Sequence, residues 1–97
     1  MKVHDFVAIA KATIDDLVDV IEAINVKDEF DVDFRDEVLI IDNISGQFVI
    51  NYHSVANQIW LSSPISGPHH FDYNPEDTLW KNRHGVELKS LLLKELS

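Results

Sequence analysis

Six acidic side chains in the first third of this 97-residue chain have the types and spacing to bind cations. They are Asp15, Asp19, Glu22, Glu29, Asp31 and Asp33. The first three stand four and three residues apart, so in a helix they share one face, with neighbouring Cβ atoms about 5–6 Å apart. Like charges this close repel one another, and a bound cation relieves the repulsion. Because carboxylate oxygens suit hard cations, the group predicts an open, weak and poorly selective metal site on the surface.

The same acids also fit a solvated surface without a ligand, because charged side chains keep edge strands from pairing with other chains and usually serve solubility. The distribution of charge bears on this choice. Residues 1–42 carry 12 acidic and four basic side chains, whereas residues 43–97 carry five and four. Of the net charge of −9, therefore, −8 lies in the first segment. Solubility alone is served by charge spread over the whole surface, so the asymmetry needs a local explanation.

The composition excludes several classes of function. With 17 acidic against eight basic side chains, the protein is poorly suited to nucleic acid or to an anionic membrane, since both reward Lys and Arg. The chain has no Cys, which excludes disulfides, thiolate metal sites and Cys nucleophiles. No apolar stretch approaches the roughly 20 residues that cross a bilayer. Because Met1 leads almost directly into a patterned segment without a presequence, we expect a cytoplasmic protein rather than one of the mitochondrial matrix.

A second group, Asn51, Gln58 and Trp60, predicts a protein-binding surface. In the alternating segment 58–62 the aliphatic residues should face the core, which turns Trp60 to the other face together with Gln58. Asn51 belongs to the polar set of the preceding segment and should share that face. A Trp among amides on an exposed sheet is typical of a binding hot spot. The alternative is a Trp covered by the segment 69–73 or by a loop.

The remaining polar residues predict no catalytic or cofactor site. His69 and His70 are adjacent, so on a strand they point to opposite faces and cannot ligate one metal ion. The Ser and Pro residues of segment 62–68 lack the G-x-S-x-G pattern of a nucleophile and fit a stiff turn better. The chain has only three glycines, which do not form a phosphate-binding loop.

Two helices and six strands are expected to position these residues. Apolar residues recur every three or four positions over 4–24 and 86–96, which predicts amphipathic helices. The apolar stripe of the first helix comprises Phe6, Ile9, Thr13, Leu17, Val20, Ile21 and Ile24, widened by Ala10 and Ile14. Between the helices the apolar period changes to two, and the predicted strands cover 30–34, 38–41, 47–53, 58–62, 69–73 and 79–83. This order indicates an α+β fold: one domain over residues 1–97, a two-layer sandwich with both helices on one face of an antiparallel sheet.

The segment Asn57–Pro68, with the sequence NQIWLSSPISGP, and the HHFDY that follows it are similar to the frataxin family. The QIWLSSP run with its SGP is highly specific, and it is closer to the mitochondrial branch than to most bacterial members. The resemblance continues through FVIN at 48–51 and through the closing GV-x-L-x-x-LL pattern at 85–92, so it covers essentially the whole chain. Without a presequence, the chain resembles a bacterial frataxin homologue.

The resemblance implies a frataxin-like α–β sandwich and an iron-binding regulator of iron–sulfur cluster assembly, rather than an enzyme. Five acids match acidic positions of the family, and a sixth matches an acid of its bacterial members. The resemblance implies that iron, as Fe²⁺ or Fe³⁺, binds weakly at these six positions. They are Asp15, Asp19, Glu22, Glu29, Asp31 and, for the bacterial members, Asp33. The resemblance also implies contact of Asn51, Gln58 and Trp60 with the cysteine desulfurase and the scaffold protein, as iron donor or sensor. It implies a monomer, with iron-induced oligomers as a further expectation. The enzyme-class alternative is a ferroxidase and iron-storage protein that oxidises Fe²⁺ at surface carboxylates.

Two departures from the family pattern modify these expectations. Val7, Lys11, Ala12 and Ala23 occupy helix positions where eukaryotic relatives often carry acids, so the acidic surface is thinner here. His70 stands where mitochondrial members favour Arg, and this difference is expected to weaken or alter the contacts with partner proteins.

Overall fold

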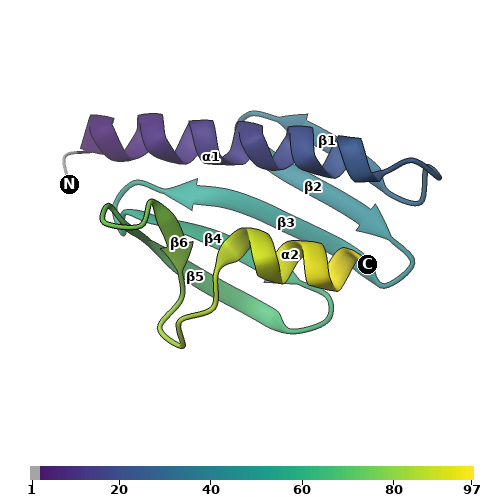
Figure 1. Ribbon diagram of the computed structural model, residues 1–97. Helices are drawn as coiled ribbons and strands as arrows, with labels where there is room; N and C mark the ends of the chain where they lie inside the picture. Colours follow the sequence, from purple (N-terminus) through teal and green to yellow (C-terminus); the bar gives the residue numbers. More distant parts are fainter. Residues whose placement is uncertain (1–2) are drawn as a thin grey trace.

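The chain folds into two helices and six strands in the order α1, β1 to β6, α2 (Figure 1). The computed structural model describes the backbone of residues 3–97 and the side chains from residue 5 onward. The elements are α1 (Val3–Ile24), β1 (Asp31–Arg35), β2 (Val38–Asn43), β3 (Gly46–His53), β4 (Gln58–Ser63), β5 (Gly67–Asn74), β6 (Leu79–Lys81) and α2 (Leu88–Leu96). The predicted α+β class is confirmed, and each predicted segment agrees with its element to within two residues.

The sheet forms one layer of the sandwich and the two helices form the other. Neighbouring strands pair antiparallel in the order β1-β2-β3-β4-β5-β6, so each strand lies beside its neighbours in sequence. Short turns are enough for this sheet, because antiparallel strands need no crossover connection. Both helices cover the same face (Figure 1), with α1 against β1 and β3 and α2 against β6. The other face of the sheet is open, and β1 is an edge strand.

The core lies between the two layers. Its buried residues are Phe6, Ala10, Ile14, Leu17, Ile21, Phe30, Leu39, Ile41, Phe48, Ile50, Ile59, Leu61, Phe71, Trp80, Leu88, Leu92 and Leu96. The predicted stripe of α1 is displaced: Ala10 and Ile14 are fully buried rather than marginal, whereas Ile24 is 43% exposed. Half-buried Thr13 lies at the margin of the buried side, where its hydroxyl donates to a carbonyl one turn earlier (2.8 Å) and accepts from the indole Nε1 of Trp80 (2.9 Å). A polar residue with these partners belongs at that margin, and the more apolar Ala10–Ile14 side of the helix lies over the sheet.

A side-chain bond ends β6 two residues before the predicted end. The Asn82 carboxamide oxygen accepts hydrogen bonds from the backbone N–H groups of His84 (2.9 Å) and Val86 (3.0 Å), and this turns the chain out of the sheet. β6 therefore stops at Lys81. As a result, it pairs with β5 only along Asp72–Asn74.

A carboxylate cap sets the start of α2, which begins at Leu88 rather than at residue 86. The Glu87 side chain accepts hydrogen bonds from the backbone N–H groups of Lys89 (2.7 Å) and Ser90 (3.0 Å), two donors that the helix itself cannot satisfy. Glu87 is extended, with φ −91° and ψ 138°, as an N-cap residue must be. Over the described residues, neither helix is long and apolar enough to cross a membrane.

The register of the sheet decides which side chains share the open face. Asn51 on β3 pairs with Trp60 on β4, and Trp60 pairs with His70 on β5, so these three residues lie side by side. On β1, Asp31 and Asp33 flank a core-facing residue and therefore project from the same open face. The open face thus holds acids at its β1 edge and aromatic and amide groups at β3 to β5.

Candidate functional site

Three of the predicted cation ligands lie on the outer face of α1. Asp15, Asp19 and Glu22 are all exposed. Their spacing of four and three residues places them along one side of the helix, while the buried residues of α1 occupy the side that packs on the sheet. The three carboxylates therefore form a line of negative charge in solvent.

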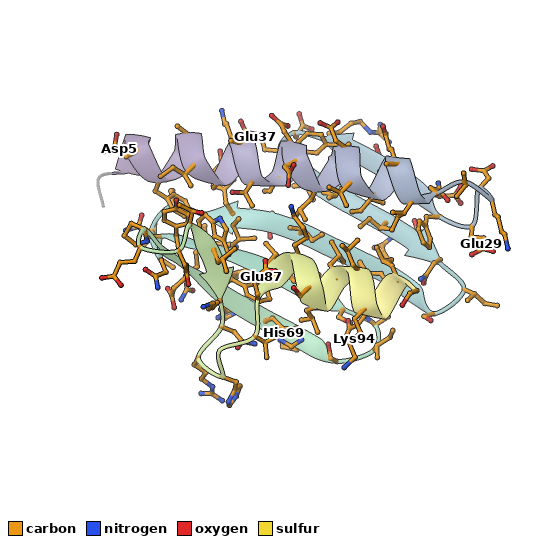
Figure 2. All side chains as sticks on the ribbon, viewed as in Figure 1. Asp5, Glu29, Glu37, His69, Glu87 and Lys94 are labelled. Carbon is orange, nitrogen blue, oxygen red and sulfur yellow. The ribbon has the colours of Figure 1, made fainter. Side chains whose placement is uncertain are left out.

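The other predicted ligands lie at the edge strand β1 and just before it. Glu29 is exposed in the loop between α1 and β1, at the end of the molecule where Figure 2 labels it. Asp31 is exposed on β1, whereas Asp33 is half-buried. The Arg35 guanidinium donates to both carboxylate oxygens of Asp33, at 2.9 and 2.7 Å, and this bond holds the pKa of Asp33 below its ordinary value. The charge of Asp33 is thus already balanced by a neighbour.

The two groups of carboxylates surround one edge of the sandwich. We call this region the acidic edge, and it consists of Asp15, Asp19, Glu22, Glu29, Asp31 and Asp33. The helix carries three of them on the layer above the sheet, and β1 turns two of them to the open face below. Because β1 is the edge strand and contacts α1, the groups meet around that edge. Among the residues whose side chains are described, no three His, Asp or Glu side chains are grouped so that they could hold one metal ion.

A Lys–Glu–Tyr contact joins α1, the β1–β2 turn and β3 beside the acidic edge. Lys11 Nζ lies 2.6 Å from Glu37 Oε1, and the Tyr52 hydroxyl donates to the other oxygen of the same carboxylate. Figure 2 labels Glu37 next to α1. The bond from Lys11, followed by that from Tyr52, lowers the pKa of Glu37, and bonding to Glu37 raises the pKa values of Lys11 and Tyr52. This contact fixes the turn that leads out of β1, and with it the position of the acidic edge.

Trp60, Gln58 and Asn51 meet on the open face, as their alternation predicts, and we call these three residues the Trp60 face. The indole Nε1 of Trp60 donates to Gln58 Oε1 at 2.9 Å. Gln58 Nε2 donates in turn to Asp72 Oδ1 on β5 at 3.1 Å. Because Gln58 is bonded through both its oxygen and its nitrogen, the orientation of its amide is fixed by its partners. The Trp60 face is therefore held by a chain of hydrogen bonds across β4 and β5.

Two imidazole rings sandwich the Trp60 indole. The His53 ring lies 3.4 Å from it, centroid to centroid, with 20° between the planes. The His70 ring lies 4.2 Å away on a plane inclined by 11°. Trp60 is consequently half-buried between two rings rather than covered by a strand or a loop. Stacking of this kind fixes the indole in one orientation.

The whole chain matches one protein family, because the family model for the frataxin-like domain aligns with residues 1–97. The chain belongs to the frataxin family. This confirms the resemblance carried by the NQIWLSSPISGP segment. Frataxins are generally iron-binding and are linked to iron–sulfur cluster biogenesis.

Individual frataxins are similar to the chain in sequence and in structure. It is 38% identical over 96 residues to the mitochondrial frataxin of Dictyostelium discoideum, a match that covers 97% of this chain and 50% of that protein. It is 39% identical over 98 residues to the mitochondrial frataxin of Arabidopsis thaliana, covering 96% and 52%. The chain thus spans about half the length of these relatives.

Two solved structures share the fold. A trimeric frataxin from the yeast Saccharomyces cerevisiae, complexed with ferrous iron, superposes with a TM-score of 0.81 at 31% identity, over 91% of this chain and 81% of that one. A frataxin from Psychromonas ingrahamii superposes with a TM-score of 0.85 at 23% identity, over 99% and 89%, and at that identity it shows the fold alone.

Sequence reasoning about this frataxin missed the two rings that hold Trp60 and the contact that holds Glu37. The signal for His70 was present in principle, because it stands directly opposite Trp60 once the register of β4 and β5 is known. His53 reaches the indole diagonally from β3, which the register also permits. The pairing of Glu37 with Lys11 joins residues in different elements, so no local sequence pattern predicts it. The roles of the six acids as metal ligands and of the Trp60 face as a partner surface remain predictions.

Proposed function

We propose that this frataxin binds iron weakly at the acidic edge and assists and regulates iron–sulfur cluster assembly, acting on the cysteine desulfurase–scaffold complex as iron donor or sensor. The observation that carries the proposal is the separation of two surfaces: acids gathered at the α1–β1 edge, and an ordered Trp-centred face on β3 to β5. The family membership and the yeast neighbour complexed with ferrous iron support the choice of iron as the cargo.

The acidic edge suits a cation that arrives and leaves with most of its water. Carboxylate oxygens are hard ligands, and exposed ones can approach an ion singly or in pairs while water fills the remaining positions. Asp15 and Glu22 on α1 and Glu29 and Asp31 near β1 are exposed. Asp33 contributes less, because Arg35 already holds its carboxylate. We therefore expect low affinity and easy transfer, as iron delivery or sensing requires.

The Trp60 face suits a protein partner. A half-buried Trp held in one orientation loses little side-chain freedom on binding, and such residues carry much of the energy of protein interfaces. Asn51 and Gln58 offer amide groups beside it. Trp60 is three strands away from β1, which places it about 14 Å across the sheet from that edge. One surface can therefore meet the assembly complex while the other holds iron.

The decisive experiment measures desulfurase activity together with the scaffold, with and without this protein, across a series of Fe²⁺ concentrations. We expect the protein to change the rate, and the size of the change to depend on Fe²⁺. A variant with Asp15→Asn, Glu22→Gln and Asp31→Asn should lose the iron dependence while still binding the complex. A rate that is the same with and without the protein at every Fe²⁺ concentration would contradict the proposal.

The second candidate is a ferroxidase and iron-storage role, which the trimeric state of the yeast neighbour favours, because storage needs an assembly. Carboxylates stabilise Fe³⁺ over Fe²⁺, so slow oxidation in air is expected from any such surface. Stopped-flow oxygen consumption with excess Fe²⁺ separates the two roles. Saturable turnover that Asp15→Asn or Glu22→Gln abolishes would favour the enzyme, whereas a rate equal to that of free iron would exclude it.

A further inference from the structure

A pocket opens at the free edge of β5, apart from the acidic edge. β6 pairs only with Asp72–Asn74, so the earlier residues of β5 lie beside the loop of residues 82–87 that leads from β6 to α2 (Figure 1). Figure 2 labels His69 in this part of β5. The pocket has a volume of about 580 Å³. Small-molecule sites in proteins span roughly 300–1,000 Å³, so the space is large enough for a ligand.

The charged and titratable residues that line this pocket are mostly basic, in contrast to the acidic composition of the chain as a whole. Three of the five histidines and one of the two arginines line it, against a single carboxylate, that of Asp72. Asp72 accepts the hydrogen bond from Gln58, so its carboxylate belongs to the side of the pocket that borders the Trp60 face. In a protein with a net charge of −9, such a gathering of cationic and potentially cationic groups needs an explanation.

A chain of hydrogen bonds orients the donors of the pocket. The Asn82 oxygen is occupied by two backbone N–H groups, so its Nδ2 faces His69 Nδ1, at 3.5 Å, as a donor. His69 Nδ1 is therefore the acceptor, and the proton of the ring sits on Nε2, which lies 2.7 Å from Ser66 Oγ. Since Ser66 Oγ accepts this bond, its own hydroxyl proton is left to donate to a ligand.

Arg83 supplies positive charge from the loop opposite, and His84 lies beside it. Both residues are exposed, and both line the pocket. Arg83 Nε lies 3.4 Å from His84 Nε2 and donates to it, so the two terminal nitrogens of the guanidinium are not used in that bond. A planar guanidinium with free terminal N–H groups matches two oxygens of a tetrahedral anion.

We propose that this pocket binds a small dianionic oxyanion, the class that includes sulfate, inorganic phosphate and phosphate monoesters. Arg83 supplies the permanent charge, the Ser66 hydroxyl supplies a neutral donor, and His70 and His84 add charge when they are protonated. The site goes beyond the proposed function, because it needs neither iron nor a protein partner.

The affinity for a dianion should be higher at lower pH, because each histidine of the lining that gains a proton adds positive charge to the site. The charged and titratable groups that face the site are Asp72, His69 and His70 from β5, and Arg83 and His84 from the loop. Behind His70 stands the indole of Trp60, with His53 on its far side. On β6, Lys81 is paired with Asp77 at 2.8 Å, so this strand adds little net charge.

The test is a titration of the ¹⁵N-labelled, iron-free protein with sodium sulfate, followed by amide chemical shifts at constant ionic strength. Sulfate keeps its charge of −2 over the whole range, so a pH effect reports on the protein alone. We expect saturable shifts centred on Ser66, His70 and residues 82–85 at pH 6, and about tenfold weaker binding at pH 8. Inorganic phosphate, titrated in parallel, should shift the same amides.

Matched variants identify the residues that bind. Arg83→Gln should weaken sulfate binding about tenfold, because a charge-assisted contact is lost, and Lys27→Gln, in the exposed loop before β1, should leave it unchanged. His70→Gln should reduce the pH dependence, whereas His53→Gln, which removes the other ring stacked on Trp60, should not. Shifts that grow linearly with sulfate, or that survive Arg83→Gln undiminished, would overturn the proposal. His84→Gln is a second variant that tests the contribution of a histidine to sulfate binding, at a position that does not contact the Trp60 stack.

Discussion

The acidic edge and the Trp60 face are built in opposite ways. Five of the six acids are exposed, and the half-buried one, Asp33, pairs with the exposed Arg35. Exposed ion pairs are worth little, so the fold depends little on these charges. Trp60 is instead locked by two stacked rings and by its bond to Gln58. The comparison teaches that residues of the acidic edge can be substituted at small cost to stability. The Trp60 face instead keeps its shape only if each residue that orients the indole is retained.

The largest expected effect is that of Trp60→Ala on association with the desulfurase–scaffold complex. Removing a central aromatic should weaken association about 30-fold, or about 2 kcal/mol, by calorimetry or surface plasmon resonance. Iron titration should be unchanged, because the acidic edge is untouched. Val55→Ala, a fully exposed apolar residue in the β3–β4 turn, is the control. Unchanged affinity in Trp60→Ala would mean that the partner binds elsewhere.

Removing one stacked ring should have a smaller effect of the same kind. His53→Ala leaves the indole free to rotate, so we expect partner affinity to fall about fivefold, which corresponds to about 1 kcal/mol. Near-ultraviolet circular dichroism of Trp60 should weaken in parallel. Lys94→Ala, exposed on α2 in the other layer, should change neither quantity. If His53→Ala lost partner affinity without any change in the Trp signal, direct contact of the imidazole would replace orientation as the explanation.

Neutralising part of the acidic edge should separate binding from stability. Glu29→Gln combined with Asp31→Asn should lower iron uptake and leave the Tm unchanged or raise it by about 1–3 °C, because like-charge repulsion is relieved. Isothermal titration with Fe²⁺ under nitrogen and differential scanning calorimetry measure the two quantities. Glu76→Gln, an exposed acid in the β5–β6 turn, controls for the loss of an acidic charge elsewhere on the surface. A large fall in Tm would show that these acids have structural partners.

The smallest expected effect concerns Glu37, whose bonds to Lys11 and Tyr52 hold its pKa below the ordinary 4.5 in the folded state. A lowered folded-state pKa stabilises the fold above the unfolded value, and this contribution is lost as the pH falls through the lowered value. Glu37→Gln should therefore lower the Tm by about one or two degrees at pH 7 and by nothing at an acidic pH at which Glu37 is protonated in the folded protein. Thermal melts at both pH values measure this. An equal fall in Tm at both pH values would show that the substitution acts through the shape of the side chain rather than through its charge.

The alternation of apolar and polar residues predicted the layers of the fold and the face of Trp60, because both follow from a period that is visible within one strand. The stack on Trp60 was not predictable in this way, because His70 meets it only through the pairing of β4 with β5. Likewise, Lys11 and Glu37 come together only when α1 crosses the β1–β2 turn. Local periodicity fixes which way a side chain faces, whereas contacts between elements depend on register and crossing angle, which one sequence does not display.

The early end of β6 has a consequence for self-association. Because β6 pairs with only three residues of β5, the first half of β5 has no strand paired on its outer side, and a strand from another molecule could add there once the loop of residues 82–87 moved aside. Pro68 lies in that half, paired with Ser62 of β4 on its other side. A proline has no N–H, so the edge lacks one donor that an added strand would require. Replacing Pro68 by a residue with an N–H should therefore make concentrated solutions of the protein more prone to form strand-linked aggregates.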